Sequence, residues 1–381
     1  MFWGDGMKKV VCTLVMIILM STNVFGYDIS SVKAIGAVLV DMENGRVLWG
    51  KNEDKPLAMA STTKIMTAII ALETGNMEDY VTISKRAASA PEVDIDLQTG
   101  DRVKLKDLLY ALMLKSANDS AIAIAEHIGG SVENFAKLMN DKAFEIGAKD
   151  TEFVTPNGLD EGDHHSTAED MALIASYALR NEDFVKIINT ESYSFISEKG
   201  RSYFVSNANR LLKEYEGAFG VKTGFTCKAG HCFVGAAQRD GVMLVCAVLG
   251  SGWGASGKEY KWSDTKAILD YGFENYSKVT LIEDGTSAGS VEVDLSDSKE
   301  IKLEVEGNIS ALLTEEEKES LKMITILPEA IKAPVKKGQR VGFIRIYIDD
   351  FLLGEADIKT TEAAEGKAFV KTMNELMKNW V

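Results

Sequence analysis

The spacing of apolar residues predicts a chain that mixes short strands with amphipathic helices. Residues 34–41 and 46–49 are two apolar stretches separated by the turn-forming residues 42–45, which predicts a β-hairpin. Apolar residues at helical spacing follow Ser61, and Gly75 stands where that helix is expected to end. Further helices are predicted at 105–114, 119–128, 131–146 and 265–276.

Another helix start is predicted near residue 166. Ser166 and Glu169 have the spacing of a capping box before the apolar run 171–174. We interpret His164 and His165 as part of the loop leading into this helix, because histidines are common in such loops. We assign no catalytic or ligand role to any of the chain's 4 histidines.

From Gly217 the pattern changes to that of β-strands. Strands are predicted at 218–223, 232–237 and 243–249, the last two joined as a hairpin across Asp240-Gly241. The stretch 243–249 is apolar almost throughout, which indicates a strand covered on both faces by helices. The fold class is therefore mixed α/β (α+β), with an antiparallel sheet covered by helices.

The C-terminal part of the chain alternates apolar and polar residues and predicts a small all-β domain with half-solvated sheets. The alternating apolar positions are Val291, Val293, Leu295, Ile301, Leu303, Val305, Phe343, Ile344, Ile346 and Ile348. No constellation of chemically active residues is found there, so we expect a spacer or interaction role. The final stretch, 363–381, places Phe369, Met373, Leu376, Met377 and Trp380 on one helical face, which either docks on the β domain or lies at a membrane surface.

The length of the chain indicates the number of domains, and its net charge restricts the kinds of partner it can bind. The chain has 381 residues, 46% of them hydrophobic, which favours two domains over one. Its formal net charge of −15 argues against nucleic acid as a partner, since phosphate binding needs clustered Lys and Arg. The acidity itself is interpreted as favouring solubility.

The N-terminus has the features of an export signal. Lys8-Lys9 precede the apolar run 10–20, which is too short to cross a bilayer, and cleavage is expected after Gly26. The less favoured alternative is that this segment is retained as a membrane anchor. The expected organisation is a signal peptide at 1–26, a catalytic domain at 27–277, a β-rich domain at 278–358 and an amphipathic helix at 359–381. The protein is expected to leave the cytoplasm.

Cysteine usage leaves two alternatives open. Cys12 lies in the expected signal, so three cysteines remain and at most one intramolecular disulfide can form. Cys227 and Cys232 either pair across a short loop or stay free, and the sequence favours neither. No metal-binding pattern is recognised, and no cofactor is expected.

Three short motifs carry the candidate chemistry. Ser61-Thr62-Thr63-Lys64 joins a hydroxyl nucleophile to an amine base on one face of a helix start. Ser116-Ala117-Asn118 is expected on the connection between two helices, and Lys222-Thr223-Gly224 at the end of a strand. Gly224 lets the strand approach a substrate without a Cβ in the way. Each motif is weak alone, but the order and context of the three make a strong signal together.

This motif set resembles that of the penicillin-recognising serine acyltransferases. Residues 30–275 resemble the low-molecular-mass D-alanyl-D-alanine carboxypeptidases in particular, because Thr155-Pro156-Asn157-Gly158-Leu159-Asp160 and residues 165–175 are similar to segments of that family. The small β domain and the amphipathic tail also match its layout. The resemblance implies a fold like that of β-lactamases and transpeptidases, peptidoglycan stem peptides as substrates, and β-lactams as covalent inhibitors.

The resemblance also implies roles in catalysis. Ser61 attacks the carbonyl between two D-alanines and forms an acyl-enzyme, while Lys64 takes the proton of Ser61. Burial and the nearby cation of Lys222 are expected to lower the pKa of Lys64. Ser116 relays the proton to the leaving amine.

Substrate binding is implied for a second group of residues. Asn118 hydrogen-bonds a substrate amide, and Lys222 and Thr223 hold the terminal carboxylate. The oxyanion hole pairs the N–H of Ser61 with that of Phe225, close to Gly224. Related enzymes often place an arginine near the carboxylate, where this chain has Lys258 and Lys261; we leave that position unassigned.

Three other functions compete with a carboxypeptidase. A serine β-lactamase shares the motifs, but no E-x-x-L-N segment lies between Asn118 and Lys222, and Ser116-Ala117-Asn118 departs from the S-D-N of class A enzymes. A non-catalytic wall-binding protein would usually have lost Ser61, Lys64 or Lys222. An endopeptidase that cuts cross-links between stem peptides would use the same mechanism.

Overall fold

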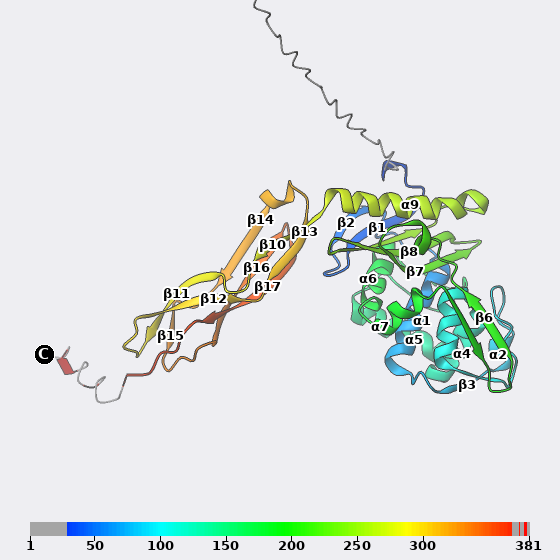
Figure 1. Ribbon diagram of the computed structural model, residues 1–381, viewed down its shortest axis with the longest axis horizontal. Helices are drawn as coiled ribbons and strands as arrows, with labels where there is room; N and C mark the ends of the chain where they lie inside the picture. Colours follow the sequence, from blue (N-terminus) through cyan, green and yellow to red (C-terminus); the bar gives the residue numbers. More distant parts are fainter. Residues whose placement is uncertain (1–28, 368–372, 374–376, 379–381) are drawn as a thin grey trace, which may run out of the picture.

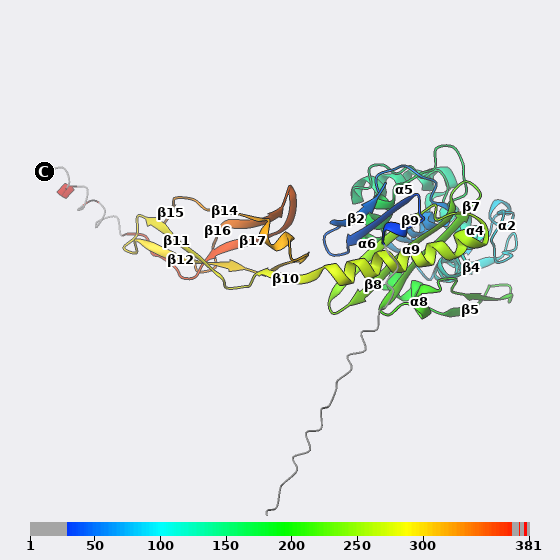
Figure 2. The ribbon, with the colours of Figure 1, turned by 90° about the horizontal axis from the view of Figure 1, so that it is seen from above.

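The structure is a computed structural model that describes residues 29–367, 373 and 377–378. The expected signal peptide at 1–26 lies outside the described residues. Figures 1 and 2 show an elongated molecule in which a unit of helices and sheet is followed end to end by a slender β unit. The long helix α9 (Gly254–Asn275) leads directly to the first strand of the β unit, β10 (Ser277–Ile282).

An antiparallel five-stranded sheet forms the centre of the first unit. Its order is β2 (Val47–Lys51), β1 (Gly36–Asp41), β9 (Val242–Leu249), β8 (Gly230–Arg239) and β7 (Ala218–Thr226). The predicted hairpins β1–β2 and β8–β9 are both present. Strand β7 lies at one edge of this sheet, so one side of its backbone is not paired with another strand of the sheet.

Helices cover both faces of this sheet. Helix α9 packs on β8 and β9, where Trp262, Ile268 and Leu269 join the apolar core of one face. Helix α6 (Ala168–Ala178) packs on the other face, with α1 (Lys64–Thr74) behind it. Seven of the eight residues of β9 are buried, which confirms the expectation of a strand covered on both sides.

Most of the remaining helices lie on the α6 side. They are η2 (Ala60–Thr63), α2 (Lys85–Ala88), α3 (Leu105–Tyr110), the π-helical turn η3 (Ala111–Lys115), α4 (Asn118–Gly129), α5 (Val132–Ile146) and α7 (Glu182–Ile188). The short η1 (Ile29–Ser31) and α8 (Leu211–Glu214) lie on the α9 side, where Ile29 and Leu211 pack in the same apolar core as Trp262. Two small hairpins complete the unit: β3 (Tyr80–Thr82) with β4 (Arg102–Lys104), and β5 (Ser192–Ile196) with β6 (Ser202–Ser206). Gly75 follows the last residue of α1 as expected.

Four element boundaries differ from the prediction. Asn118 is the first residue of α4 rather than part of a loop, and the K-T-G motif lies inside β7, which continues to Thr226. Helix α6 is capped by Thr167, whose side chain accepts from the N–H of Asp170, because the backbone of Ser166 is already paired with Leu57. Helix α9 begins at Gly254, eleven residues before the expected start, since its first turns carry buried polar residues rather than an apolar stripe.

The second unit is all β. Its six-stranded sheet has the order β14 (Leu321–Ile326), β16 (Arg340–Ile348), β17 (Phe351–Thr360), β12 (Glu300–Glu306), β11 (Ser287–Asp294) and β15 (Ala330–Lys332). Strand β10 pairs with β13 (Ile309–Leu313), and η4 (Glu317–Glu319) precedes β14. Burial alternates along β12, which confirms the half-solvated sheet, whereas Leu295 follows the end of β11 and is 55% exposed. Leu295 was therefore wrongly predicted to point inward.

The C-terminal stretch begins as strand rather than helix. Strand β17 continues to Thr360, and Ala364 forms a bridge with Val335, so the helix expected from residue 359 does not start there. Most of the remainder of that expected helix lies outside the described residues. Every helix in the described part of the chain is too short or too polar to span a membrane.

The two units contact each other at the β1–β2 hairpin. The guanidinium of Arg46 donates to the carbonyl of Leu312 at 2.9 Å and forms an ion pair with Glu317. The hydroxyl of Tyr276 donates to the carbonyl of Leu48 at 2.8 Å, and Leu312 shares the apolar core of α9. These buried contacts attach the β unit to the sheet that carries the candidate site.

The cysteines of the described chain are free thiols. Cys232 and Cys246 are buried in strands β8 and β9, and Cys227 is exposed in the turn between β7 and β8. Of the two alternatives that the sequence left open, the structure therefore has the unpaired cysteines.

Candidate active site

The residues predicted from the three motifs meet at one cavity of about 280 Å³. It lies between the edge strand β7 and the helical elements η2, η3 and α4. Six of the eight candidate residues line it: Ser61, Ser116, Asn118, Thr223, Gly224 and Phe225. The other two, Lys64 and Lys222, are buried, with exposed fractions of 0% and 2%. The cavity also has walls that the motifs did not predict, formed by Glu92, Val93, Lys115, Ala208, His231 and Lys261.

Ser61 lies in the first turn of η2, where a buried histidine supports the backbone. Ala60 adopts a left-handed φ of 50°, and its carbonyl accepts from the hydroxyl of Thr63 at 2.8 Å. His164 Nδ1 accepts from the N–H of Val154, so Nε2 carries the proton and donates to the Thr63 hydroxyl at 2.9 Å. Burial lowers the pKa of His164 to about 4, which keeps it neutral. This support has no local sequence motif, and we did not predict it.

Lys64 connects all parts of the site. Its Nζ donates to Ser61 Oγ at 2.9 Å, to Asn118 Oδ1 at 2.7 Å and to the carbonyl of Asn157 at 2.5 Å. These three contacts fix the position of the nitrogen beside Ser61 Oγ.

The loop that carries Asn157 fits closely against η2. Gly158 has a φ of +84°, and a Cβ there would lie 2.0 Å from the carbonyl oxygen of Ala60. Only glycine fits this conformation and this contact. The buried hydroxyl of Thr67 donates to the carbonyl of Pro156 at 2.6 Å and anchors the loop to α1. The segment 155–160 therefore serves the site through its backbone, which places the Asn157 carbonyl on Lys64.

Three buried lysines, Lys64, Lys222 and Lys261, lie at the cavity, and each of the last two lowers the pKa of the one before it. Burial, and then the charge of Lys222, lowers the pKa of Lys64 well below its ordinary value. Burial, and then the charge of Lys261, lowers the pKa of Lys222 to about 7. Burial also lowers the pKa of Lys261 to about 8. Both causes that we expected for Lys64 act in the structure, and a third lysine extends the series.

Asn118 and Ser116 occupy the opposite wall from β7. The side chain of Asn118 accepts from Lys64 and donates through Nδ2 to the carbonyl of Pro91 at 2.8 Å. Ser116 ends the π-helical turn in a left-handed conformation, with a φ of 67°. Among the described residues the Ser116 hydroxyl has no hydrogen-bond partner, so it is available to a molecule in the cavity.

The edge of β7 closes the other wall. A Cβ on Gly224 would lie 3.0 Å from the backbone nitrogen of Ser61 and 3.1 Å from the carbonyl of Met59. The absence of a side chain therefore allows β7 to pack directly against the turn that holds the nucleophile. Phe225 follows on the same strand, and its ring lies 4.4 Å from that of His231 between centroids.

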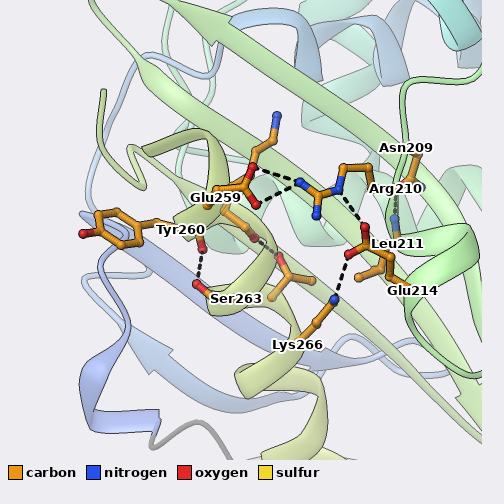
Figure 3. A network of polar contacts seen from close by, with 10 residues as sticks. Asn209, Arg210, Leu211, Glu214, Glu259, Tyr260, Ser263 and Lys266 are labelled. Atoms are coloured by element: carbon orange, nitrogen blue, oxygen red, sulfur yellow. Dashed lines mark hydrogen bonds and ion pairs between the residues drawn. The ribbon is translucent and has the colours of Figure 1, made fainter. Parts of the chain in front are cut away.

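Lys261 reaches the cavity from α9 and is only 7% exposed. Two residues that flank Lys261 on α9, Glu259 and Lys266, form ion pairs with α8 (Figure 3). Arg210 donates to both oxygens of Glu259 at 2.9 Å, and Lys266 donates to Glu214 at 2.9 Å. Arg210 also donates to Glu214 at the other end of α8, so the two residues that bind α9 are themselves joined. This network fixes the turn of α9 that carries Lys261, one of the two lysines we had left unassigned.

Comparison with known proteins now identifies the family. The family described as D-alanyl-D-alanine carboxypeptidase matches residues 23–252, which is more than half of the chain. This chain belongs to that family. It is therefore a member of a family of serine-type carboxypeptidases, as the motifs predicted. Residues 276–365 match the domain described as the C-terminal domain of penicillin-binding protein 5.

Individual relatives are similar to this chain in sequence and in structure over most of its length. The D-alanyl-D-alanine carboxypeptidase DacF of Bacillus subtilis is 34% identical over 91% of this chain and 90% of its own length. Penicillin-binding protein 5 of Haemophilus influenzae superimposes with a TM-score of 0.71 at 28% identity, over 88% of this chain and 98% of that one. The DD-transpeptidase of Streptomyces K15 superimposes with a TM-score of 0.60 at 33% identity, over 64% of this chain and 98% of that one. The predicted fold class, including the C-terminal all-β domain, is confirmed.

Within the described residues, no group of His, Cys, Asp or Glu side chains is arranged to hold a metal ion.

Proposed function

We propose that this protein is a serine D-Ala-D-Ala carboxypeptidase that removes the terminal D-alanine from peptidoglycan stem pentapeptides through an acyl-enzyme on Ser61. The observation that carries this proposal is the 2.9 Å contact between Ser61 Oγ and Lys64 Nζ, because Lys64 is fully buried and lies beside a second lysine. A lysine whose pKa is lowered in this way can act as a general base near neutral pH.

The reaction then proceeds in balanced steps. The neutral amine of Lys64 takes the proton of Ser61, and Oγ attacks the carbonyl carbon of the bond between the two D-alanines. The N–H groups of Ser61 and Phe225 receive the negative charge on the carbonyl oxygen. Ser116 relays the proton to the leaving nitrogen, the C–N bond breaks and D-alanine departs. Water then hydrolyses the ester, which frees the shortened peptide and returns the proton to Ser61.

Recognition of the substrate is assigned to the two walls. Lys222, Thr223 and Lys261 lie on the β7 and α9 side, where two positive charges and a hydroxyl suit the terminal carboxylate. Asn118 lies on the other side and binds a peptide amide of the substrate. We add Lys261 to the carboxylate site because it is buried, lines the cavity and lowers the pKa of Lys222.

The same acylation would make the protein penicillin-binding. A β-lactam ring presents a strained amide and a nearby carboxylate to the same nucleophile and the same lysines. We expect a long-lived ester on Ser61, since the E-x-x-L-N segment that supplies the water-activating glutamate of class A β-lactamases is not found between Asn118 and Lys222. Rapid hydrolysis of a chromogenic cephalosporin would instead indicate the β-lactamase alternative.

The location follows from the same proposal. We infer that residues 1–26 direct export and that the enzyme acts outside the cytoplasm, with 27–277 as its catalytic part and 278–358 as its β-rich part. Whether residues 363–381 dock on the β unit or on a membrane surface can be tested by fractionating cells that express the chain with and without them. A full-length protein found only in the soluble fraction would contradict membrane association.

The test is release of D-alanine from N-acetyl-lysyl-D-Ala-D-Ala by the purified protein and by Ser61→Ala. Release by the first and none by the second supports the proposal. Release from cross-linked muropeptides alone would indicate an endopeptidase. A folded protein that releases no D-alanine and binds no labelled penicillin would indicate a non-catalytic wall-binding protein, and would contradict the proposal.

A further inference from the structure

Two charged side chains line the cavity without a part in the proposed reaction. They are Glu92, on the loop before β4, and Lys115, the last residue of the π-helical turn. Both residues are exposed, and neither forms an ion pair with any residue that the structure describes. A carboxylate and an ammonium group thus lie in the same cavity without an ion-pair partner among the described residues.

The loop that carries Glu92 is held in a costly conformation. Glu92 has a φ of 67°, a left-handed conformation that L-residues other than Gly, Asn and Asp seldom adopt. The loop is clamped to α4 on both sides of Glu92, because Asn118 donates from Nδ2 to the carbonyl of Pro91 at 2.8 Å and from its backbone to that of Val93 at 2.7 Å. The carboxylate of Asp119 accepts from two further loop N–H groups at 3.1 Å.

This clamp gives the Glu92 carboxylate a fixed backbone at the wall of the cavity that Asn118 forms. Its charge already acts at the site, since it opposes the lowering of the Lys64 pKa. Lys115 is fixed in a comparable way, because the next residue, Ser116, has the left-handed φ of 67° that ends the turn. Both charges are therefore presented by rigid backbone rather than by mobile loop tips.

The position of the two charges indicates which part of a substrate they meet. The carboxylate of the leaving D-alanine is assigned to Lys222, Thr223 and Lys261 on the other wall. Glu92 and Lys115 adjoin Asn118 and Ser116 on the opposite wall, and the leaving D-alanine carries no charged group other than that carboxylate. A charged group that contacts them must therefore belong to the peptide that stays on Ser61.

We propose that Glu92 and Lys115 together recognise a zwitterionic side chain, with an ammonium and a carboxylate on its terminal carbon, on the residue that precedes D-Ala-D-Ala. This inference rests on the proposed carboxypeptidase function and makes its substrate more specific. Glu92 accepts hydrogen bonds from the ammonium group, and Lys115 donates to the carboxylate. A diamino diacid fits both residues, a lysine side chain fits only Glu92, and a neutral side chain fits neither.

The test uses three N-acetyl tripeptides that end in D-Ala-D-Ala and differ only in the preceding residue. This residue is meso-diaminopimelate, lysine or Nε-acetyl-lysine. We expect kcat/KM to fall in that order, by about threefold at each step, as is usual for charge pairs in a site open to solvent. In Glu92→Gln the ratio of the lysine peptide to the acetyl-lysine peptide falls to about one. In Lys115→Gln that ratio remains, and the ratio of the diaminopimelate peptide to the lysine peptide falls to about one.

Ratios are measured because removing the Glu92 charge also changes Lys64, which alters the rate on all three peptides equally. Asp94→Asn is the matched control, since Asp94 lies on the same loop but does not line the cavity, and it should keep both ratios. Ratios near one in the wild type, or wild-type ratios in both Gln variants, would overturn the inference. Cleavage of the acetyl-lysine peptide shows that the proposed function stands even then, whereas no cleavage of any peptide contradicts the function itself.

Discussion

The five-stranded sheet and the six-stranded sheet hold their positive charges in different surroundings. Beside the five-stranded sheet, Lys64, Lys222 and Lys261 are buried and form no ion pair with any described residue. On the six-stranded sheet, basic residues pair with acids instead, as in Arg340–Asp357, Arg345–Glu355 and Lys359–Glu306. Helices cover both faces of the five-stranded sheet, whereas the six-stranded sheet has one face in solvent. Basic side chains are therefore desolvated beside the first sheet and solvated on the second.

This difference is the physical reason for placing the proposed chemistry in the first region alone. An exposed, paired lysine keeps its proton and contributes little beyond solubility and a surface ion pair. A lysine buried beside another lysine loses its proton more easily, because both burial and repulsion disfavour the charged form. The covering helices are therefore part of the proposed catalytic site, because they desolvate its lysines.

The largest effect is expected from removing the base. Lys64→Met should lower the rate of acylation by labelled penicillin by about 1,000-fold or more, because no other described group within reach of Ser61 Oγ can take its proton. Lys64→Met leaves Asn118 Oδ1 and the carbonyl of Asn157 without their donor, so the acylation rate is measured on protein whose fold has been checked by circular dichroism. Lys302→Met on the six-stranded sheet is the matched control and should leave acylation unchanged. A Lys64→Met protein that is acylated within tenfold of the wild-type rate would contradict the role of Lys64.

A smaller effect is expected at Lys261. Lys261→Ala should raise KM for a D-Ala-D-Ala peptide by about tenfold, which is typical for the loss of a charged hydrogen bond. The pKa of Lys261 is about 8, so its positive charge is present below that pH and is lost as the pH rises through it. Arginine stays charged, so Lys261→Arg should retain more of kcat/KM above pH 8. Superimposable pH profiles of the wild type and Lys261→Arg would remove Lys261 from the carboxylate site.

The burial of Lys222 should also make the free energy of unfolding depend on pH. Lys222 has a pKa of about 7 in the folded protein against an ordinary 10.5, so the unfolded chain binds more protons between these values. The free energy of unfolding should therefore fall as the pH falls from about 10 to about 7, by at most about 1.4 kcal/mol per pH unit from this residue. Urea titrations of the wild type and Lys222→Met measure this slope. Equal slopes in the two proteins would show that Lys222 is not desolvated.

The smallest effect on activity is expected from the β unit. Leu303 is buried in the core of the six-stranded sheet, and Leu303→Ala should cost about 2–4 kcal/mol of stability through the cavity it leaves. The rate of acylation per folded molecule should stay within twofold of the wild type at temperatures below unfolding. A loss of acylation in the folded Leu303→Ala protein would mean that the two regions are not separable in the way described here.

The sequence predicted the parts of the site that carry local patterns. Ser61 and Lys64 share one helical turn, and Lys222 to Gly224 form a continuous stretch, so their types and spacing are visible without a structure. The β1–β2 hairpin and the doubly covered β9 were also predictable, because turn residues and an unbroken apolar run indicate them directly. These features are determined by residues that are close together in the sequence.

Other parts of the site are formed by residues that are far apart in the sequence and meet only in the folded protein. Asn157 acts through its backbone carbonyl, which no side-chain pattern reveals, and His164 supports Ala60 from a loop about 100 residues away. Lys261 lies in turns of α9 that lack an apolar stripe, so even its helix was expected to begin later. Glu92 and Lys115 were not predicted, because an exposed charged residue cannot be distinguished from other surface charges in the sequence until the cavity is known.

The central claim is that Ser61 is acylated with the help of a buried, deprotonated Lys64. The most direct measurement is mass spectrometry of the protein after incubation with a penicillin, followed by digestion to locate the modified peptide. The account predicts one penicilloyl group per molecule on the peptide that contains Ser61, and none in Ser61→Ala. An unmodified wild-type protein that is folded, or an adduct that persists on Ser61→Ala, would contradict it.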